Sequence, residues 1–136
     1  MSLPTAARIF GVIYLVVGGL GFVRMLSPAL PDPPHLVIGT TVFLFGLFAV
    51  NVVHNIIHIG IGLGGLLAGG QFGSARSYFR FVAVVYVLLV ICGLIPLTNT
   101  FFGIAPLFGH DIWLHALTAI AAIYFARLPA PVDEAA

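Results

Sequence analysis

The sequence predicts an all-α membrane protein with four transmembrane helices, arranged as a parallel duplication of a two-helix unit. Of the 136 residues, 61% are hydrophobic and 7% are charged, whereas the surface of a water-soluble protein usually carries about 25–35% charged residues. The hydrophobic residues form blocks near the length of about 20 residues at which a helix spans a bilayer. These blocks also repeat in pairs. We therefore expect residues 1–136 to form one transmembrane bundle.

The expected elements follow from the boundaries of these blocks. The first block contains internal glycines and ends near Arg24, which favours a retained span over a cleaved signal. The block 36–70 is too long for one span, since a helix of that length would extend about 52 Å against a hydrocarbon core of about 30 Å. Residues 28–50 are therefore expected to form an extracytoplasmic loop with an interfacial or re-entrant segment. The spans are expected at about 8–26, 51–70, 80–97 and 109–127, followed by a cytoplasmic tail at 128–136.

The arginines orient this topology. Arg8, Arg76, Arg80 and Arg127 fall on one side of a four-span bundle and only Arg24 falls on the other, so the positive-inside rule places both termini in the cytoplasm. The expected location is a bacterial plasma membrane or a photosynthetic membrane. The arginines form no basic stripe, which excludes nucleic acid as a partner.

The chain repeats itself at two fixed shifts. A shift of 72 residues aligns Tyr14 with Tyr86, and a shift of 57 residues aligns His58 with His115. Each unit contains two spans, so both copies enter the membrane from the same side and the repeat is parallel.

Small residues follow one face of the second span and of the fourth span. Their three- and four-residue spacing allows helix backbones to approach closely, as in other membrane bundles. The predicted helix-packing residues are Gly62, Gly65, Gly69, Ala119, Ala122 and Ala126.

His58 and His115 are the main candidates for cofactor binding, because ionisable groups inside a membrane usually indicate function. Two imidazoles that face each other across a bundle are suited to ligate a haem iron, a chlorophyll magnesium or a transition metal. The alternative is that each histidine forms hydrogen bonds between helices. Tyr14 and Tyr86 are expected about 10 Å below the histidines, near the cytoplasmic ends of their spans.

A metal site is predicted from four residues that form two pairs of i, i+4 spacing, His54 with His58 and Asp111 with His115. Three imidazoles and one carboxylate suit zinc, copper or iron. The alternative for Asp111 is that it caps the start of the fourth helix.

Two motifs resemble those of a bacterial family of small four-span membrane proteins catalogued as a domain of unknown function. They are Asn51-Val-Val-His54-Asn-Ile-Ile-His58 and Ile112-Trp113-Leu114-His115, each followed by a span of small residues. The resemblance covers nearly the whole chain. This sequence has Ile112 where the family usually has Asn and Ala119 where it usually has Gly. The resemblance implies the four-span topology and no particular activity or cofactor.

The function expected first is that of a non-enzymatic membrane protein, an accessory or stabilising subunit of a larger membrane complex. Short loops and few polar residues favour this interpretation, as does the absence of hydrolase and nucleotide-binding motifs. One alternative is a haem, chlorophyll or metal-binding module, and a second is a small transporter or proton path. The expected partners are the lipid bilayer and other membrane subunits or further copies of the chain.

Overall fold

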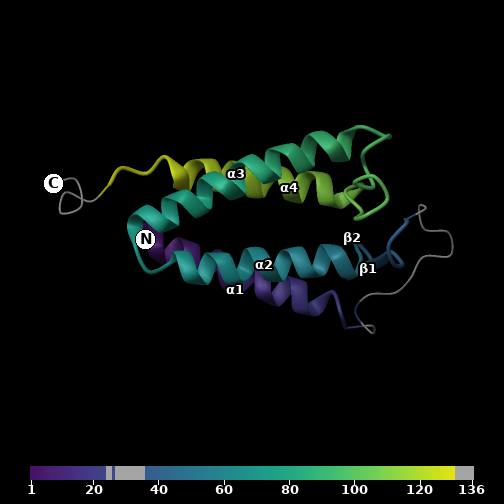
Figure 1. Ribbon diagram of the computed structural model, residues 1–136, viewed down its shortest axis with the longest axis horizontal. Helices are drawn as coiled ribbons and strands as arrows, with labels where there is room; N and C mark the ends of the chain where they lie inside the picture. The colour runs from purple at the N-terminus through teal and green to yellow at the C-terminus, as the bar shows by residue number, and fades with distance from the viewer. Residues whose placement is uncertain (24–25, 27–35, 131–136) are drawn as a thin grey trace.

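Four helices lie alongside one another in the computed structural model of the chain, which describes residues 1–23, 26 and 36–130 (Figure 1). The elements in chain order are α1 (Leu3–Leu20), β1 (Val42–Leu44), β2 (Phe48–Val50), α2 (Val52–Ala68), α3 (Phe72–Leu94) and α4 (His110–Ala126). The expectations for Arg24, for residues 28–35 and for most of the C-terminal tail, residues 131–136, lie outside the described residues.

The helices pack in pairs. Helix α1 packs chiefly on α2, and α3 packs chiefly on α4, so we call these the first and the second helix pair (Figure 1). The first pair is held close by glycine: a Cβ atom placed on Gly11 would lie 2.8 Å from the carbonyl oxygen of Gly62. A Cβ atom on Gly65 would lie 2.7 Å from the carbonyl oxygen of Ala7. Side chains other than hydrogen at these positions would push the two helices apart.

Two helices begin earlier than the sequence predicted. Helix α1 begins at Leu3 because the Ser2 side chain accepts a hydrogen bond from the Thr5 backbone N–H and a proline occupies the first turn. Helix α3 begins at Phe72, so its first turns include the polar stretch that we expected to be a loop. There the Arg76 guanidinium donates to the Leu128 carbonyl and lies 4.5 Å above the Phe72 ring.

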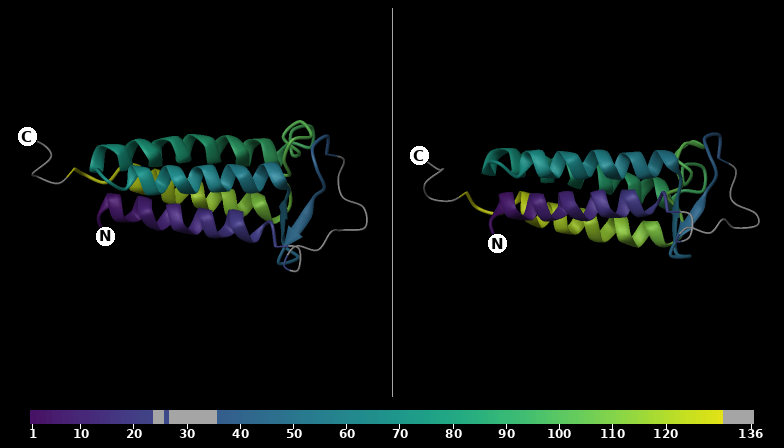
Figure 2. Two further views of the ribbon diagram at one scale, coloured as in Figure 1. Left: turned by 60° about the horizontal axis from the view of Figure 1, so that its bottom comes forward. Right: turned by 90° about the horizontal axis from the view of Figure 1, so that it is seen from below.

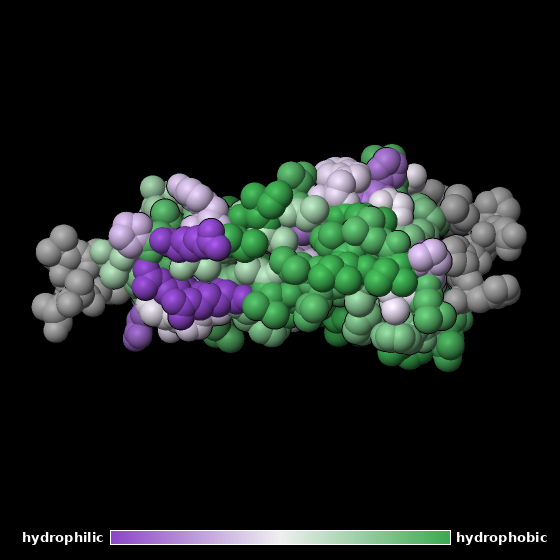
Figure 3. Space-filling model, turned by 90° about the horizontal axis from the view of Figure 1, so that it is seen from above, coloured by the Kyte–Doolittle hydropathy of each residue, from purple (hydrophilic) through white to green (hydrophobic). Residues whose placement is uncertain are grey.

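The outer surface of the bundle is strongly apolar. Helices α1 and α3 are each long and apolar enough to cross a membrane, and α2 is a shorter apolar helix. Many large apolar side chains face outward, and Leu67 and Leu97 are more than 80% exposed. Hydrophilic side chains gather at the end of the bundle where α1 begins and α4 ends, next to a broad hydrophobic surface (Figure 3). Monomeric soluble proteins rarely expose apolar patches of this extent.

Residues 42–50 form a two-stranded antiparallel ribbon, in which Val42 pairs with Val50. The turn between the strands contains Phe45 at φ 55° and Gly46 at φ 71°. The segment expected to be interfacial or re-entrant is therefore extended here and not helical. The ribbon lies across the end of the bundle at which α2 and α4 begin (Figure 2). It leads directly into Asn51, whose side chain caps α2 by accepting from the His54 backbone N–H.

Candidate metal centre

Three buried histidines come together between the helix pairs. His54 and His58 lie one turn apart on α2, and His115 lies on α4. Their exposed fractions are 5%, 7% and 2%. One ring nitrogen from each residue lies within 4.8 Å of the other two. The structure thus brings together three of the four residues predicted for a metal site.

His54 is held in one orientation by its hydrogen bond to the loop before α4. Its Nδ1 lies 3.2 Å from the carbonyl oxygen of Pro106. A carbonyl only accepts hydrogen bonds, so Nδ1 carries the proton and Nε2 keeps its lone pair. Metal-ligating histidines usually donate their second ring N–H to a carbonyl or carboxylate in this way.

The other two histidines have an unused ring nitrogen. Nδ1 of His58 and Nδ1 of His115 are buried, and neither has a hydrogen-bond partner among the described residues. Our alternative interpretation, that His58 and His115 form hydrogen bonds between helices, does not account for these two nitrogens. A buried polar atom without a partner is unfavourable, and an ion bound between the rings would supply the missing interaction.

Asp111 lies one turn before His115 and serves a different purpose from the one expected. Its carboxylate accepts a hydrogen bond of 2.9 Å from the backbone N–H of Ala49, in the ribbon of the first half of the chain. The N-cap of α4 is Gly109, which has no side chain to cap the helix. Asp111 is therefore not the N-cap residue, but it lies in the first turn of α4, where a carboxylate suits the helix dipole. Within the described residues the metal-ligand group consists of the three histidines alone.

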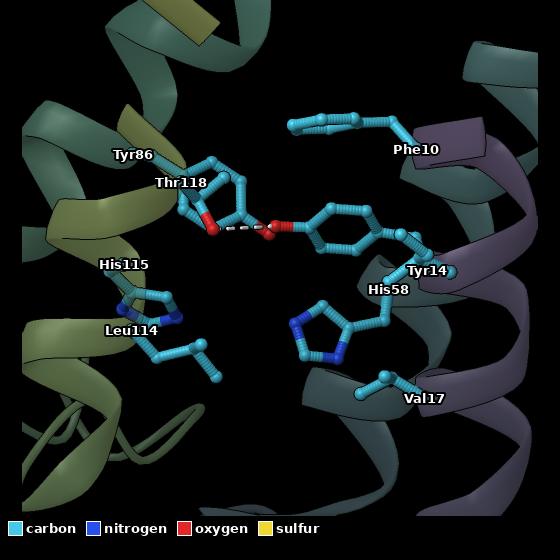
Figure 4. Close-up of a pocket in the computed structure, with 9 residues that line it drawn as sticks. Phe10, Tyr14, Val17, His58, Tyr86, Leu114, His115 and Thr118 are labelled. Atoms are coloured by element: carbon cyan, nitrogen blue, oxygen red, sulfur yellow. Dashed lines mark hydrogen bonds between the residues drawn. The ribbon is translucent and has the colours of Figure 1, made fainter. Parts of the chain in front are cut away.

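Two tyrosines adjoin the histidines, one from each helix pair. The ring of Tyr14 lies 5.3 Å from that of His58, and the ring of Tyr86 lies 5.2 Å from that of His115. Tyr14 also donates a hydrogen bond of 3.2 Å to the Thr118 hydroxyl (Figure 4). The expectation that these tyrosines lie well below the histidines is wrong, because α1 begins at Leu3 and Tyr14 consequently lies higher along its helix. The sequence feature that pointed to Tyr14 and Tyr86 was their alignment under the 72-residue shift.

Two cavities border the cluster, and both are lined by His58, His115 and Tyr86. The first, of about 170 Å³, lies between α1 and α4, where His58 and His115 face each other from opposite helix pairs (Figure 4). The second, of about 160 Å³, lies between α2 and α3 and is also lined by His54. A cavity of roughly 150 Å³ is large enough for one benzene ring.

The predicted packing residues divide between the two helix pairs. Gly62 and Gly65 face Gly11 across the α1–α2 contact, and Gly69 lies against the Arg8 side chain. On α4, Ala119 and Ala122 are buried in the hydrophobic core, and Ala126 packs against that core.

These observations define a class of protein, a four-helix bundle with an apolar surface, two helices able to cross a membrane and three converging histidines in its interior. Residues 5–128 match the family described as Domain of unknown function (DUF4383). The chain belongs to that family, and the resemblance carried by the sequence motifs is confirmed. Neither a curated protein nor a solved structure matches the chain.

Proposed function

We propose that the chain is an integral membrane protein that binds one transition-metal ion through His54, His58 and His115. The observation that carries this proposal is the convergence of three buried ring nitrogens within 4.8 Å of one another. Imidazole is a common ligand of zinc, copper, iron and nickel. Ring nitrogens around an ion lie roughly 2.0–2.1 Å from it, so the three imidazoles move closer together when the ion binds.

The membrane part of the proposal is that all four helices span a bacterial membrane, with both termini in the cytoplasm. The apolar exposed surface supports it, as does the gathering of hydrophilic residues at the end where the termini lie. Helices α2 and α4 have 17 residues each, which is near the lower limit for a span.

The proposal includes the duplication of a two-helix unit, and equivalent contacts support it. The 72-residue shift relates Tyr14 to Tyr86, and the 57-residue shift relates His58 to His115. The two tyrosine–histidine contacts are therefore equivalent, and their ring distances are 5.3 and 5.2 Å. Residues 45–46 and 102–103 are related by the 57-residue shift, and all four have positive φ angles.

A second pair of equivalent contacts crosses between the two halves of the chain. His54 and Asp111 are equivalent, and so are their backbone partners, Pro106 and Ala49. In each half of the chain, a side chain at the start of the second helix therefore forms a hydrogen bond with the backbone of the other half. The two backbone partners occupy equivalent positions in the segments that precede α2 and α4. The two cavities are also equivalent: Ile13, Val17 and Leu114 line one, and Val85, Leu89 and Ile57 line the other.

We expect copper in its monovalent state to be the preferred ion. Three neutral imidazoles leave the whole charge of the ion uncompensated, and the free-energy cost of burying a charge grows steeply with its magnitude. The Asp111 carboxylate is engaged by the Ala49 backbone. A monovalent ion therefore suits the three histidines better than a divalent ion.

A single ion fits the site better than a haem or a chlorophyll. The three imidazoles converge on one point, whereas a macrocycle would have to separate His58 from His115 and displace His54. Each adjoining cavity has room for about one six-membered ring, and a porphyrin contains four pyrrole rings.

The test is to measure metal bound to the purified protein in mild detergent. Elemental analysis of protein from its native membrane, followed by copper(I) titration against a chromophoric chelator, should give one ion per chain. We expect His54→Ala, His58→Ala and His115→Ala each to weaken copper(I) binding at least 100-fold. The matched control is His110→Ala, since His110 is exposed and accepts a hydrogen bond from the Trp113 indole.

Equal binding by the His58→Ala variant and the wild type would refute the site. Stoichiometric zinc with no affinity for copper(I) would keep the site and overturn the choice of ion. A visible haem or chlorophyll spectrum that depends on His58 and His115 would replace the single ion with a macrocycle.

The accessory-subunit function and the transporter or proton-path function stay predictions. Co-purification of larger membrane subunits with the chain would support the first, and flux into liposomes that depends on His58 would support the second. An intramembrane metal ion is compatible with either.

A further inference from the structure

A long groove runs along the outside of the second helix pair. One hollow of about 450 Å³ is lined by Arg80, Ala83, Val84, Ile123, Ala126 and Arg127. A second hollow, of about 250 Å³, continues it toward the middle of the bundle and shares three of these residues, Ala83, Val84 and Ile123. The groove therefore has a basic end and an apolar length.

The basic end is formed by one arginine from each helix. Arg80 lies on α3 and Arg127 is the C-cap residue of α4, and both side chains are exposed. Both arginines line the same hollow as the apolar side chains of Val84 and Ile123. Guanidinium groups bind phosphate oxygens in bidentate geometry and do so better than ammonium groups.

The first helix pair differs at the equivalent positions. Arg8 is equivalent to Arg80, but its side chain packs directly against Gly69. The position equivalent to Arg127 is Gly70, which carries no charge. The paired arginines are thus a feature of the second helix pair.

We infer that this groove binds an anionic glycerophospholipid, with its phosphate between Arg80 and Arg127 and one acyl chain along Ala83, Val84 and Ile123. The inference rests on the proposal that the helices span a membrane, and it is independent of the metal. Charge complementarity identifies the occupant: basic pockets between helices at the cytoplasmic side of a membrane are suited to acidic lipid headgroups. The adjoining apolar hollow matches the hydrocarbon part of the same molecule.

The test measures which lipid stays bound to the full chain. Delipidated protein is equilibrated in mixed micelles with equal amounts of phosphatidylglycerol and phosphatidylcholine, and native mass spectrometry then counts the lipids retained. We expect one phosphatidylglycerol per chain in preference to phosphatidylcholine. Arg80→Gln and Arg127→Gln should each reduce this preference about fivefold, and Arg8→Gln should change it less than twofold.

A second pair of variants tests the apolar part of the groove without changing charge. Val84→Trp fills the groove and should abolish retention of the lipid. The control is Val12→Trp, because Val12 is the equivalent residue of α1 and is 52% exposed. Equal retention of both lipids, equal effects of Arg8→Gln and Arg80→Gln, or equal effects of the two tryptophan variants would each overturn the inference. Displacement of the lipid by inorganic phosphate alone would show that the groove binds a phosphate group without the acyl chain. That result would also overturn the inference.

The His58→Ala variant separates this inference from the metal proposal. It should lose the metal and retain phosphatidylglycerol as the wild type does. A chain that is embedded in membranes, free of metal and still selective for phosphatidylglycerol would refute only the metal proposal. A chain that partitions into water would refute both.

Discussion

The two helix pairs differ in the residues that lie at their contacts. In the first pair, Gly11 faces Gly62 and Gly65, and the backbones touch. In the second pair, the residues that the two shifts align with Gly11 and Gly62 are Ala83 and Ala119, both buried in the core. A methyl group is thus buried at these positions in the second pair and sterically excluded in the first. The close approach of the two backbones in the first pair therefore depends on residues without a side chain at its contact.

The largest effect is expected from exchanging these residues. Gly11→Ala places a Cβ atom 2.7 Å from the Leu66 backbone nitrogen, where only separation of the helices gives relief. We expect a loss of about 3 kcal/mol in the free energy of unfolding. Ala83→Gly removes a methyl group without creating a clash and should cost about 1 kcal/mol, chiefly in helix propensity. Reversible unfolding in mixed micelles measures both, and equal losses would show that the pairs do not differ in tightness.

A smaller effect is expected where the halves of the chain reach across to each other. Asp111→Ala leaves the buried backbone N–H of Ala49 without its acceptor and should cost about 2 kcal/mol. Asp111→Asn keeps an oxygen that accepts from the same N–H and should cost less than half as much. The same unfolding assay, with hydrogen exchange at the Ala49 amide, checks this. If the asparagine variant were as unstable as the alanine variant, the hydrogen bond would not be what stabilises the ribbon.

The smallest effect is expected to be a gain. Gly60 lies on α2 among the packing glycines, but a Cβ atom there would meet nothing within 4 Å. Gly60→Ala should therefore stabilise the chain by about 0.5–1 kcal/mol through lower backbone entropy in the unfolded state. A rise in midpoint temperature for Gly60→Ala beside a fall for Gly11→Ala would assign the tight contact to particular glycines. A fall in midpoint temperature for both variants would mean that α2 has a packing partner on its outer face.

The helices and the histidines could be predicted from sequence because their signals are local. The apolar blocks indicated four helices, and the 57-residue shift aligned His58 with His115. Helix starts were harder to predict, because Ser2 and Pro4 lie before the apolar block. A short polar segment of this kind can form either a helix cap or a loop. Because the first span was expected to begin near residue 8, Tyr14 was placed too close to the start of its helix. Its contact with His58 was therefore not predicted.

The ribbon and the partner of Asp111 could not be predicted, because both depend on contacts between distant segments. Strands of three residues carry almost no periodicity. The hydrogen bond from Ala49 to Asp111 joins residues 62 positions apart. An aspartate near the start of a helix is usually a cap, and only the three-dimensional arrangement reveals another donor.

The hydrogen bond from His54 to Pro106 has a consequence for biosynthesis. The two residues are 52 positions apart, and a ribosome that adds about 5–20 residues per second needs roughly 3–10 s to make that length. Until Pro106 has been made, the His54 imidazole has no acceptor, although α1 and α2 are complete once Ala68 has been added. The first helix pair therefore reaches its final structure only after the loop before α4 has been made.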